Sequence, residues 1–273
     1  MSGGPATSRV LIIVPAWNEQ DAITGTIEEI RACVPGADLL VIDDGSSDHP
    51  AARAAAAGAT VCPLPFNLGV GGAMRAGYRY ALRHGYAAAV QIDADGQHDP
   101  RYLARLLDQL GTADVVIGAR FATPDDPYKV RGPRRWAMVL LARVLSRLAH
   151  TRLTDVTSGF RVSNRRAISV FATHYPAEYL GDTVESLVIA ARAGCTITQV
   201  PVTMRARVAG RASHSPVKAA IYLCRAMVAL VLALVRDWPA QLEEGATADD
   251  LEAEQLAAVQ SATPGPQGQE AHP

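Results

Sequence analysis

Residues 87–100 read AAAVQIDADGQHDP, and this stretch decides the fold class. A short apolar run, Ala87–Ile92, is typical of a buried strand, and two carboxylates, Asp93 and Asp95, follow it at once in a turn. Three other apolar runs also end at polar turns: Val10–Val14, Asp38–Ile42 and Asp114–Gly118. Helical patterns separate the runs, over residues 20–33, 49–58, 71–84 and 99–110. This order predicts a doubly wound, mainly parallel α/β sheet with a ligand at the carboxyl ends of its strands.

The second half of the chain has a less regular pattern. It predicts an amphipathic helix over residues 133–150, a short segment with the sequence SGFR, a helix over 183–194, a strand over 196–204 and an apolar helix over 216–236. Beyond residue 239 the composition turns to Glu, Asp, Ala, Gln, Gly and Pro, which predicts disorder. We therefore expect a flexible N-terminus at 1–8, one globular domain at 9–215, an amphipathic C-terminal helix at 216–238 and a disordered acidic tail at 239–273.

The composition excludes several classes of protein. The chain has 273 residues, of which 49% are hydrophobic and 19% charged, so it is neither a small disulfide scaffold nor a disordered protein. Its four cysteines, Cys33, Cys62, Cys195 and Cys224, lack metal-ligand spacing, and we expect buried thiols. The N-terminal residues have no secretory pattern, which predicts a cytoplasmic protein.

The net charge of −1 hides an uneven distribution. Eight of the 27 acidic residues follow Arg236, so residues 1–236 carry 26 basic and 19 acidic side chains and a net charge of +7. Such a balance indicates a polyanionic ligand or an anionic surface. The basic residues lie beside aliphatic rather than aromatic stretches, which argues against nucleic acid as the partner.

The DADGQHD turn has the chemistry of a metal site. Asp93 and Asp95 supply hard oxygen donors, and water with diphosphate oxygens would complete a shell for Mg²⁺ or Mn²⁺. The ion would neutralise a departing nucleoside diphosphate. The alternative is an acidic turn in which Asp99 caps the following helix. We expect Asp95 to be exposed at the strand end rather than part of the core.

Two further loops accompany strand ends. In DDGSSD, residues 43–48, Asp43 and Asp44 suit hydrogen bonds to a ribose or base, although Ser46, Ser47 or Asp48 could instead cap the next helix. The NLGVGGAM loop, residues 67–74, is not a dinucleotide fingerprint, because Met74 stands in place of the third glycine and Pro63 and Pro65 interrupt the preceding strand. Its glycines bring backbone close either to a ligand or to a neighbouring helix.

Seven motifs in order resemble glycosyltransferase family 2: PAWNE, DDGSSD, NLGVGGA, QIDADGQHDP, DVVIGAR, DVTSGFR and VPVTMRARVAGRASHS. The most similar group is that of the dolichol-phosphate mannose synthases, and the resemblance covers residues 9–236. It implies a GT-A fold, a nucleoside diphosphate sugar as donor, a divalent metal and an inverting transfer to a polyprenyl (dolichyl-type) phosphate.

The resemblance also assigns roles by position. Pro15, Trp17 and Glu19 match a donor-base pocket in which the indole stacks on the base, and Asp43 and Asp44 match nucleoside contacts. The metal and diphosphate contacts fall on Asp93, Ala94, Asp95 and Gln97, with Asp93, Asp95 and Gln97 as the metal ligands. Arg120, Arg135 and Arg207 match residues that hold phosphate charge, and Glu185, followed by Ala190 and Gly194, matches the helix behind the acceptor site.

One motif departs from the pattern. The mannose synthases have Gly-x-Ser-Lys where this chain has Gly210-Arg211-Ala212-Ser213-His214. Because the lysine is absent and related enzymes that use UDP-sugars vary here, mannose, glucose and N-acetylhexosamine all stay open as the transferred sugar.

Two stretches suggest a membrane surface. Residues 129–166 hold ten basic residues and one acid, Asp155, together with apolar residues from Trp136 to Leu148, which fits either a helix lying on anionic headgroups or a core-facing helix with a solvated Arg face. Residues 219–235 are apolar but contain Arg225, which favours an interfacial or partner-packed helix over a spanning or core helix. The predicted location is peripheral, on the inner face of the membrane, with a small membrane subunit as a further candidate partner.

The acceptor decides the predicted chemistry. A lipid phosphate is already ionised, so displacement at the anomeric carbon needs a metal and Arg side chains but no strong base; Asp95 and Arg207 would then carry catalysis. A hydroxyl acceptor on a saccharide or protein would require a carboxylate base such as Asp182 or Glu185. A protein that binds nucleotide sugars without turnover is the third hypothesis.

Overall fold

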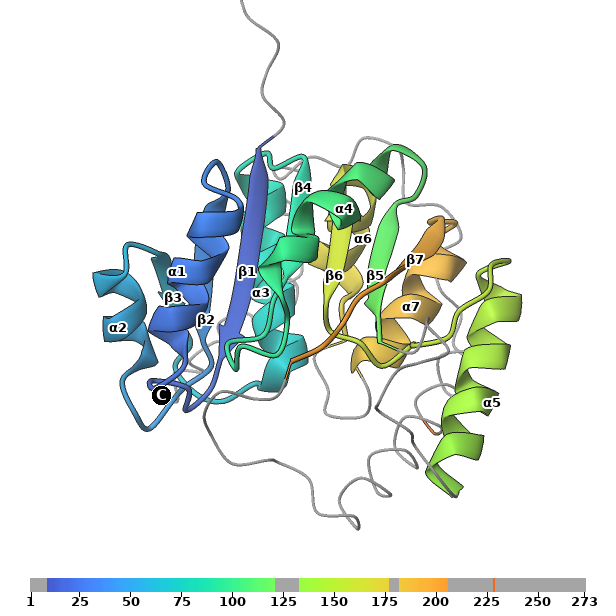
Figure 1. The fold of residues 1–273 in the computed structure, drawn as a ribbon, viewed down its shortest axis with the longest axis horizontal. Helices are drawn as coiled ribbons and strands as arrows, with labels where there is room; N and C mark the ends of the chain where they lie inside the picture. The colour runs from blue at the N-terminus through green and yellow to red at the C-terminus, as the bar shows by residue number, and fades with distance from the viewer. Residues whose placement is uncertain (1–8, 121–132, 177–181, 206–227, 229–273) are drawn as a thin grey trace, which may run out of the picture. The chain divides into compact units, whose positions relative to one another are not determined.

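The computed structural model describes residues 9–120, 133–176, 182–205 and 228, and in this part the chain forms one seven-stranded sheet (Figure 1). The strand order is β3-β2-β1-β4-β6-β5-β7. The bounds are β1 Val10–Ala16, β2 Asp38–Asp43, β3 Thr60–Pro63, β4 Ala88–Gln91, β5 Val115–Ala119, β6 Arg161–Asn164 and β7 Ile197–Pro201. The predicted strands are confirmed, although β7 is shorter than the expected strand over 196–204.

Strand β6 is the exception to a parallel sheet. It lies between β4 and β5 and runs antiparallel to both, with Arg161 opposite Gln91 on one side and Ile117 on the other. The sequence pattern predicts mainly parallel strands and marks this stretch only as an SGFR segment. The insertion of β6 places its first residue, Arg161, next to the carboxyl end of β4, where the DADGQHD turn begins.

Most helices lie where the sequence predicts them. Their bounds are α1 Ile23–Cys33, α2 Pro50–Ala56, α3 Gly69–Arg83, α4 Leu103–Asp108, α5 Pro133–Leu148, α6 Arg165–His174 and α7 Asp182–Arg192, with short 3₁₀ turns at Pro100–Tyr102 and Gln109–Gly111. The expected helix over 99–110 is therefore broken into three pieces. Helix α6 was not predicted; the Asn164 side chain begins it by accepting a hydrogen bond from the Ala167 N–H at 3.0 Å.

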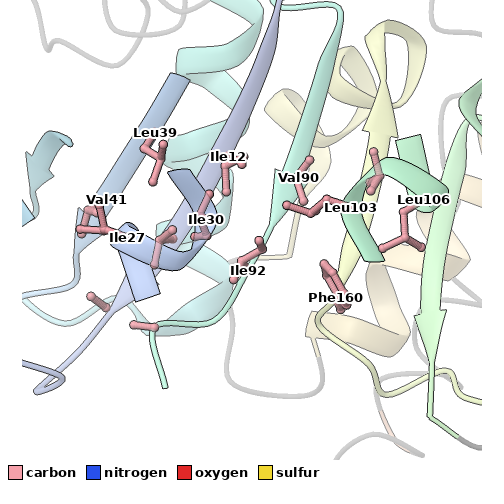
Figure 2. Close-up of a cluster of buried hydrophobic side chains, with 14 of the residues drawn as sticks. Ile12, Ile27, Ile30, Leu39, Val41, Val90, Ile92, Leu103, Leu106 and Phe160 are labelled. Atoms are coloured by element: carbon pink, nitrogen blue, oxygen red, sulfur yellow. The ribbon is translucent and has the colours of Figure 1, made fainter. Parts of the chain in front are cut away.

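The helices cover both faces of the sheet (Figure 1). On one face, α1 and α4 cover the sheet, and one buried cluster there contains Ile12 and Val14 of β1; Figure 2 shows Ile12 of this cluster with Ile27 and Ile30 of α1 and with Leu103 and Leu106 of α4. On the other face, α3 approaches β1 closely, because a Cβ added at Gly77 would lie 2.5 Å from Cγ2 of Ile13. Alternate side chains of one strand thus feed two aliphatic layers, each fully buried side chain contributing about 1.5–3 kcal/mol.

The cysteines and the terminal segments were also predicted from the sequence. Cys195 is buried as predicted, but Cys33 and Cys62 are only partly buried, so the expectation of buried thiols is wrong for both. Among the described helices none is both long and apolar enough to cross a bilayer. The expected segments at 1–8 and 239–273, the helix over 216–238 apart from Val228, and Cys224 lie outside the described residues.

Candidate active site

The loops singled out from the sequence come together at one edge of the sheet, the lower edge in Figure 1. Parallel pairing sets Ala16 at the end of β1 beside Asp43 at the end of β2, and the Asp44 N–H donates to the Ala16 carbonyl at 2.9 Å. On the other side of β1, the Ile92 N–H donates to the Ile13 carbonyl at 3.1 Å. The PAWNE, DDGSSD and DADGQHD segments therefore leave neighbouring strands at the edge where ligands of such sheets bind.

The PAWNE and DDGSSD loops are joined by hydrogen bonds. Asn18, with a left-handed φ of 55°, donates its N–H to Ser46 Oγ at 3.0 Å, and its Oδ1 accepts from the Ser47 N–H at 2.8 Å. The Gln20 N–H donates to Asp48 Oδ2 at 3.1 Å. Ser46, Ser47 and Asp48 thus do not cap α2. That helix begins after His49 without a side-chain cap. The capping alternative for DDGSSD is therefore wrong, and the two loops form one unit.

Three predicted donor-base residues occupy different positions in this unit. Pro15 is buried within β1, and Glu19 is half-buried, with its carbonyl accepting from the N–H groups of Ala22 and Ile23 at the start of α1. The Trp17 side chain is 55% exposed directly after β1. Trp17 is thus the member of this set that presents a large apolar surface to solvent, as a stacking residue requires.

The two adjacent carboxylates Asp43 and Asp44 have separate environments. Asp43 is half-buried and accepts from the Ser46 N–H at 3.1 Å. Asp44 is only 3% exposed and accepts from the Leu68 N–H at 2.7 Å; its burial raises the pKa of the carboxyl group, against hydrogen bonds from the backbone of Leu68 and Gly69 that lower it. Asp44 therefore fixes the NLGVGG loop, and Asp43 is the more accessible of the pair.

The glycines of the NLGVGG loop serve close packing. Helix α3 begins at Gly69, and a Cβ added at Gly71 would lie 2.2 Å from the Pro176 carbonyl oxygen and 3.4 Å from Cβ of Asp182. A side chain at position 71 would displace the backbone at Pro176. Of the two predicted roles for this loop, the structure thus provides direct contacts for the close approach of a neighbouring segment.

The DADGQHD turn is held from several sides. The Asp93 side chain is 36% exposed, and Gln91 Nε2 lies 3.4 Å from its Oδ1. Asp95 is buried, contrary to the expectation of an exposed residue, and its Oδ1 accepts from the Gln97 N–H at 3.0 Å across Gly96, whose φ is 75°. Between the two carboxylates, the Ala94 carbonyl accepts from Thr26 Oγ1 of α1 at 3.0 Å. Asp99 caps the next turn as the alternative reading proposed, accepting from the Arg101 N–H.

His98 supports Asp93 and was not singled out from the sequence. Its buried ring stacks on Phe160, with centroids 4.9 Å apart and planes 12° apart. Its Nδ1 accepts from the Asp93 N–H at 3.0 Å, so the proton of the neutral ring is on Nε2, 3.6 Å from Asp93 Oδ2. The histidine of the quoted DADGQHDP was visible in the sequence, but its partner Phe160 is 62 positions further along and could be found only in the fold.

The donor set fits a hard divalent cation. Asp93, Asp95 and Gln97 offer carboxylate and amide oxygens from one turn, the ligand type that Mg²⁺ and Mn²⁺ prefer. Among the described residues, no three His, Cys, Asp or Glu side chains converge to form a complete cage. A cation at this turn would therefore take further ligands from water and from a bound diphosphate.

Asp182 interacts electrostatically with Asp93 and with the buried Arg161. Arg161 is 1% exposed and donates to the Ser158 carbonyl at 2.8 Å, the Thr183 carbonyl at 2.6 Å and Ser186 Oγ at 2.7 Å. Burial raises the pKa of Asp182 at the start of α7; the charge of Arg161 opposes the shift and that of Asp93 adds to it. Glu185 lies one turn further along α7 and is half-buried. The structure thus groups Asp182 with Asp93, two residues that are 89 positions apart.

Of the three arginines predicted to contact phosphate, the structure describes the side chain of Arg120. The guanidinium of Arg120, at the end of β5, faces the fully buried Asp155, with Nε 2.7 Å from Oδ2, and also donates to Thr157 Oγ1 at 2.9 Å. This pair anchors the DVTSGFR segment to β5, so the role of Arg120 toward phosphate stays a prediction. The side chain of Arg135 in α5 and all of Arg207 lie outside the described residues.

Comparison with known proteins gives a consistent family. The profile of Glycosyl transferase family 2 matches residues 11–171. An undecaprenyl-phosphate mannosyltransferase of Micrococcus luteus is 36% identical over 218 residues, which are 76% of this chain and 88% of that protein. A polyprenol monophosphomannose synthase of Mycolicibacterium smegmatis is 29% identical over 227 residues, 79% of this chain and 85% of that protein.

Solved structures support the same fold. A glucosyl-3-phosphoglycerate synthase from Mycobacterium tuberculosis, in complex with Mn²⁺, UDP and glucosyl-3-phosphoglycerate, matches with a TM-score of 0.63 at 22% identity, over 85% of this chain and 82% of that one. At this identity the likeness concerns the fold alone. The predicted GT-A architecture is confirmed.

Proposed function

The chain belongs to glycosyltransferase family 2, and on this premise we propose that it transfers a sugar from a nucleoside diphosphate sugar to polyprenyl phosphate. The observation that carries the proposal is the meeting of three loops at one sheet edge: Trp17 after β1, Asp43 at the end of β2, and Asp93 and Asp95 after β4. Together they offer a stacking surface for a base, a carboxylate for a nucleoside and oxygen donors for a cation beside a diphosphate.

The cation is held by Asp93, Asp95 and Gln97 and is Mg²⁺ or Mn²⁺. When bound, it supplies positive charge that stabilises the leaving nucleoside diphosphate. The chain's own contribution is to fix these ligands: Thr26 holds the Ala94 carbonyl, and His98 holds the Asp93 N–H. The fold match to an enzyme solved with Mn²⁺ and UDP is compatible with this assignment.

The acceptor is proposed to be a lipid phosphate because two relatives are named for transfer to undecaprenyl phosphate and for polyprenol monophosphomannose synthesis. An ionised phosphate oxygen attacks the anomeric carbon as the bond from that carbon to the diphosphate oxygen breaks, with inversion. Arg207 and Arg135 are proposed to hold the acceptor charge. Mannose from GDP-mannose is the first sugar to test, since both relatives' names contain it, although the altered 210–214 motif keeps UDP-glucose and UDP-N-acetylhexosamines in the panel.

One observation favours a second candidate, transfer to a hydroxyl. Asp182 is grouped with Asp93, and its burial raises the pKa of its carboxyl group, the direction expected of a general base. A hydroxyl acceptor would need such a base, whereas polyprenyl phosphate would not. Asp182→Asn therefore separates the two chemistries: turnover with a lipid phosphate tolerates the loss of the base, and turnover with a hydroxyl does not.

Helix α5 supplies a surface for the membrane that carries the acceptor. Trp136 and Leu140 are exposed, and Arg143 and Arg147 are exposed at the next positions of the same helical face, while Leu141 and Leu145 are buried (α5, Figure 1). A stripe with apolar and cationic ends suits insertion among anionic headgroups. Combined Trp136→Ala and Leu140→Ala replacement is expected to weaken sedimentation with phosphatidylglycerol vesicles; equal binding by this variant and wild type would exclude α5 as the contact.

The deciding experiment offers GDP-mannose, UDP-glucose and UDP-N-acetylglucosamine with short polyprenyl phosphate and Mg²⁺ or Mn²⁺, and identifies the lipid product by mass spectrometry. The Asp95→Asn variant, which keeps an oxygen to accept the Gln97 N–H but loses the charge, should fold and make no product. Wild-type turnover that persists in excess chelator would overturn the metal assignment. Transfer to a hydroxyl acceptor with none to polyprenyl phosphate would overturn the proposed reaction.

A further inference from the structure

Arg205 connects three separate parts of the molecule. It follows β7, and its backbone N–H donates to the Gln97 carbonyl in the DADGQHD turn at 3.0 Å. Its guanidinium reaches Glu29 on α1, with Nη1 2.6 Å from Oε1 and 2.8 Å from Oε2, and Asp99, with Nη2 2.8 Å from Oδ1. Gln97 and Asp99 are the chain neighbours of His98, so Arg205 contacts the residue on each side of it.

The contacts of Arg205 complete a frame around the carboxylates of the turn. Helix α1 holds the turn at one place through Thr26, whose hydroxyl donates to the Ala94 carbonyl, and at a second place through Glu29, one turn along the helix, by way of Arg205. Between them, His98 accepts the Asp93 N–H. If residues 97–99 moved, the His98 ring that accepts a hydrogen bond from the Asp93 N–H would move with them. The Gln97 N–H, which donates a hydrogen bond to Asp95, would move as well.

We propose that Arg205 is a positioning residue that fixes residues 93–99 for binding of a divalent cation with a nucleoside diphosphate. The inference rests on the proposed function, because that function makes this turn the metal and diphosphate site. Arg205 acts on the turn through the Gln97 backbone carbonyl and the Asp99 carboxylate. No local pattern in the sequence indicates this link, since Glu29 is 176 positions from Arg205.

The chain offers a matched control. Arg101 also pairs with Asp99, with Nη2 2.6 Å from Oδ2, yet its side chain is 73% exposed, and both its Nε and its Nη2 donate to this one carboxylate. Hydrogen bonds from Arg101, followed by that of Arg205, lower the pKa of Asp99 to about 2. Arg101→Gln and Arg205→Gln each replace one positively charged partner of Asp99 with a neutral side chain. Only Arg205→Gln also removes the ion pair with Glu29.

The experiment measures binding of GDP and of UDP by calorimetry in Mn²⁺ and in chelator, with melting temperatures of each variant. Arg205→Gln is expected to weaken Mn²⁺-dependent binding about tenfold, Arg101→Gln less than twofold, and Arg205→Lys to restore part of the loss because an ammonium cannot reproduce the two-sided fork. Glu29→Gln should weaken binding in the same direction, and the Arg205→Gln and Glu29→Gln effects should not add.

The outcomes separate the two proposals. Wild-type protein that binds neither nucleotide with Mn²⁺ would overturn the proposed function and this inference with it. Wild-type binding with Arg205→Gln within twofold would overturn the positioning role alone, as would an equal loss in Arg101→Gln. If Arg205→Gln does not fold, Glu29→Gln decides: unchanged binding in that variant contradicts the role of Arg205, and weakened binding at an unchanged melting temperature supports it.

Discussion

Trp17 is the exposed aromatic residue that we propose stacks on the donor base. Its indole is 55% exposed beside the loop that carries Asp43, so Trp17→Ala should raise the donor KM by about tenfold, the effect of losing one base-stacking aromatic. The metal requirement and the free energy of unfolding should change little, because an exposed side chain contributes little packing. Steady-state kinetics with varied donor at saturating metal measure the effect.

A second exposed tryptophan provides the control for this prediction. Trp136 is 74% exposed but lies on α5 rather than at a strand end. Trp136→Ala should leave the donor KM unchanged in a detergent assay. An unchanged donor KM in Trp17→Ala would show that Trp17 makes no contact with the donor.

At the residue scale, the sequence predicts which residues gather at the site better than which way each one faces. The loops with Trp17, Asp43, Asp44, Asp93 and Asp95 do gather at one sheet edge, because strand ends fix their position. Whether a carboxylate stays accessible to a ligand depends on partners that are distant in the sequence. The Asp44 carboxylate, for example, accepts a hydrogen bond from the backbone N–H of Leu68, 24 positions away. No local pattern encodes such a contact.

Among the elements, the central part of the fold was predictable and the insertion of β6 was not. Parallel strands such as β1 are long apolar runs, which a periodicity argument detects. Strand β6 has only four residues, Arg161–Asn164, and begins with an arginine whose burial depends on acceptors from the 156–158 turn and from α7. An Arg-rich stretch reads as exposed until those acceptors are known, and α6 was missed with it.

Helix α3 gives a prediction about element packing. Because an added Cβ at Gly71 would lie 2.2 Å from the Pro176 carbonyl oxygen, Gly71→Ala should displace the Pro176 backbone and destabilise the protein by about 1–3 kcal/mol. Transfer to polyprenyl phosphate at a temperature where the variant is folded should change less than stability, because that reaction does not need Asp182, whose Cβ lies beside the same glycine, as a base. Urea unfolding and transfer assays measure the two effects.

Gly25 on α1 is the matched control for Gly71. No heavy atom lies within 4 Å of a Cβ added there, and the residue is exposed within the helix, so Gly25→Ala should stabilise the protein by about 0.5–1 kcal/mol. Equal effects of the two substitutions would mean that the close contact of Gly71 with Pro176 does not constrain the fold.

At the scale of the whole molecule, the DVTSGFR segment connects β5 and β7. Asp155 is fully buried; its carboxylate takes both the backbone N–H and the guanidinium of Arg120 after β5, and its carbonyl accepts from Gln199 Nε2 of β7 at 2.8 Å. Burial alone would raise the pKa of Asp155, but the hydrogen bonds and charge of Arg120 outweigh it and lower the pKa below its usual 3.8.

This shift predicts how global stability depends on pH. A carboxyl group whose pKa is lower in the folded state stabilises the protein fully above its unfolded pKa of 3.8, and the contribution is lost as the pH falls through the folded value. Asp155→Asn should therefore cost about 2–4 kcal/mol at pH 7, and this cost should shrink progressively as the pH falls below 3.8. Asp38→Asn is the comparison, because Asp38 and Arg9 are both more than half exposed and their pair should contribute about 1 kcal/mol or less. Urea unfolding across pH 2.5–7 measures both; an Asp155→Asn cost that equals that of Asp38→Asn, or that does not shrink in acid, would contradict a structural role for the Asp155–Arg120 pair.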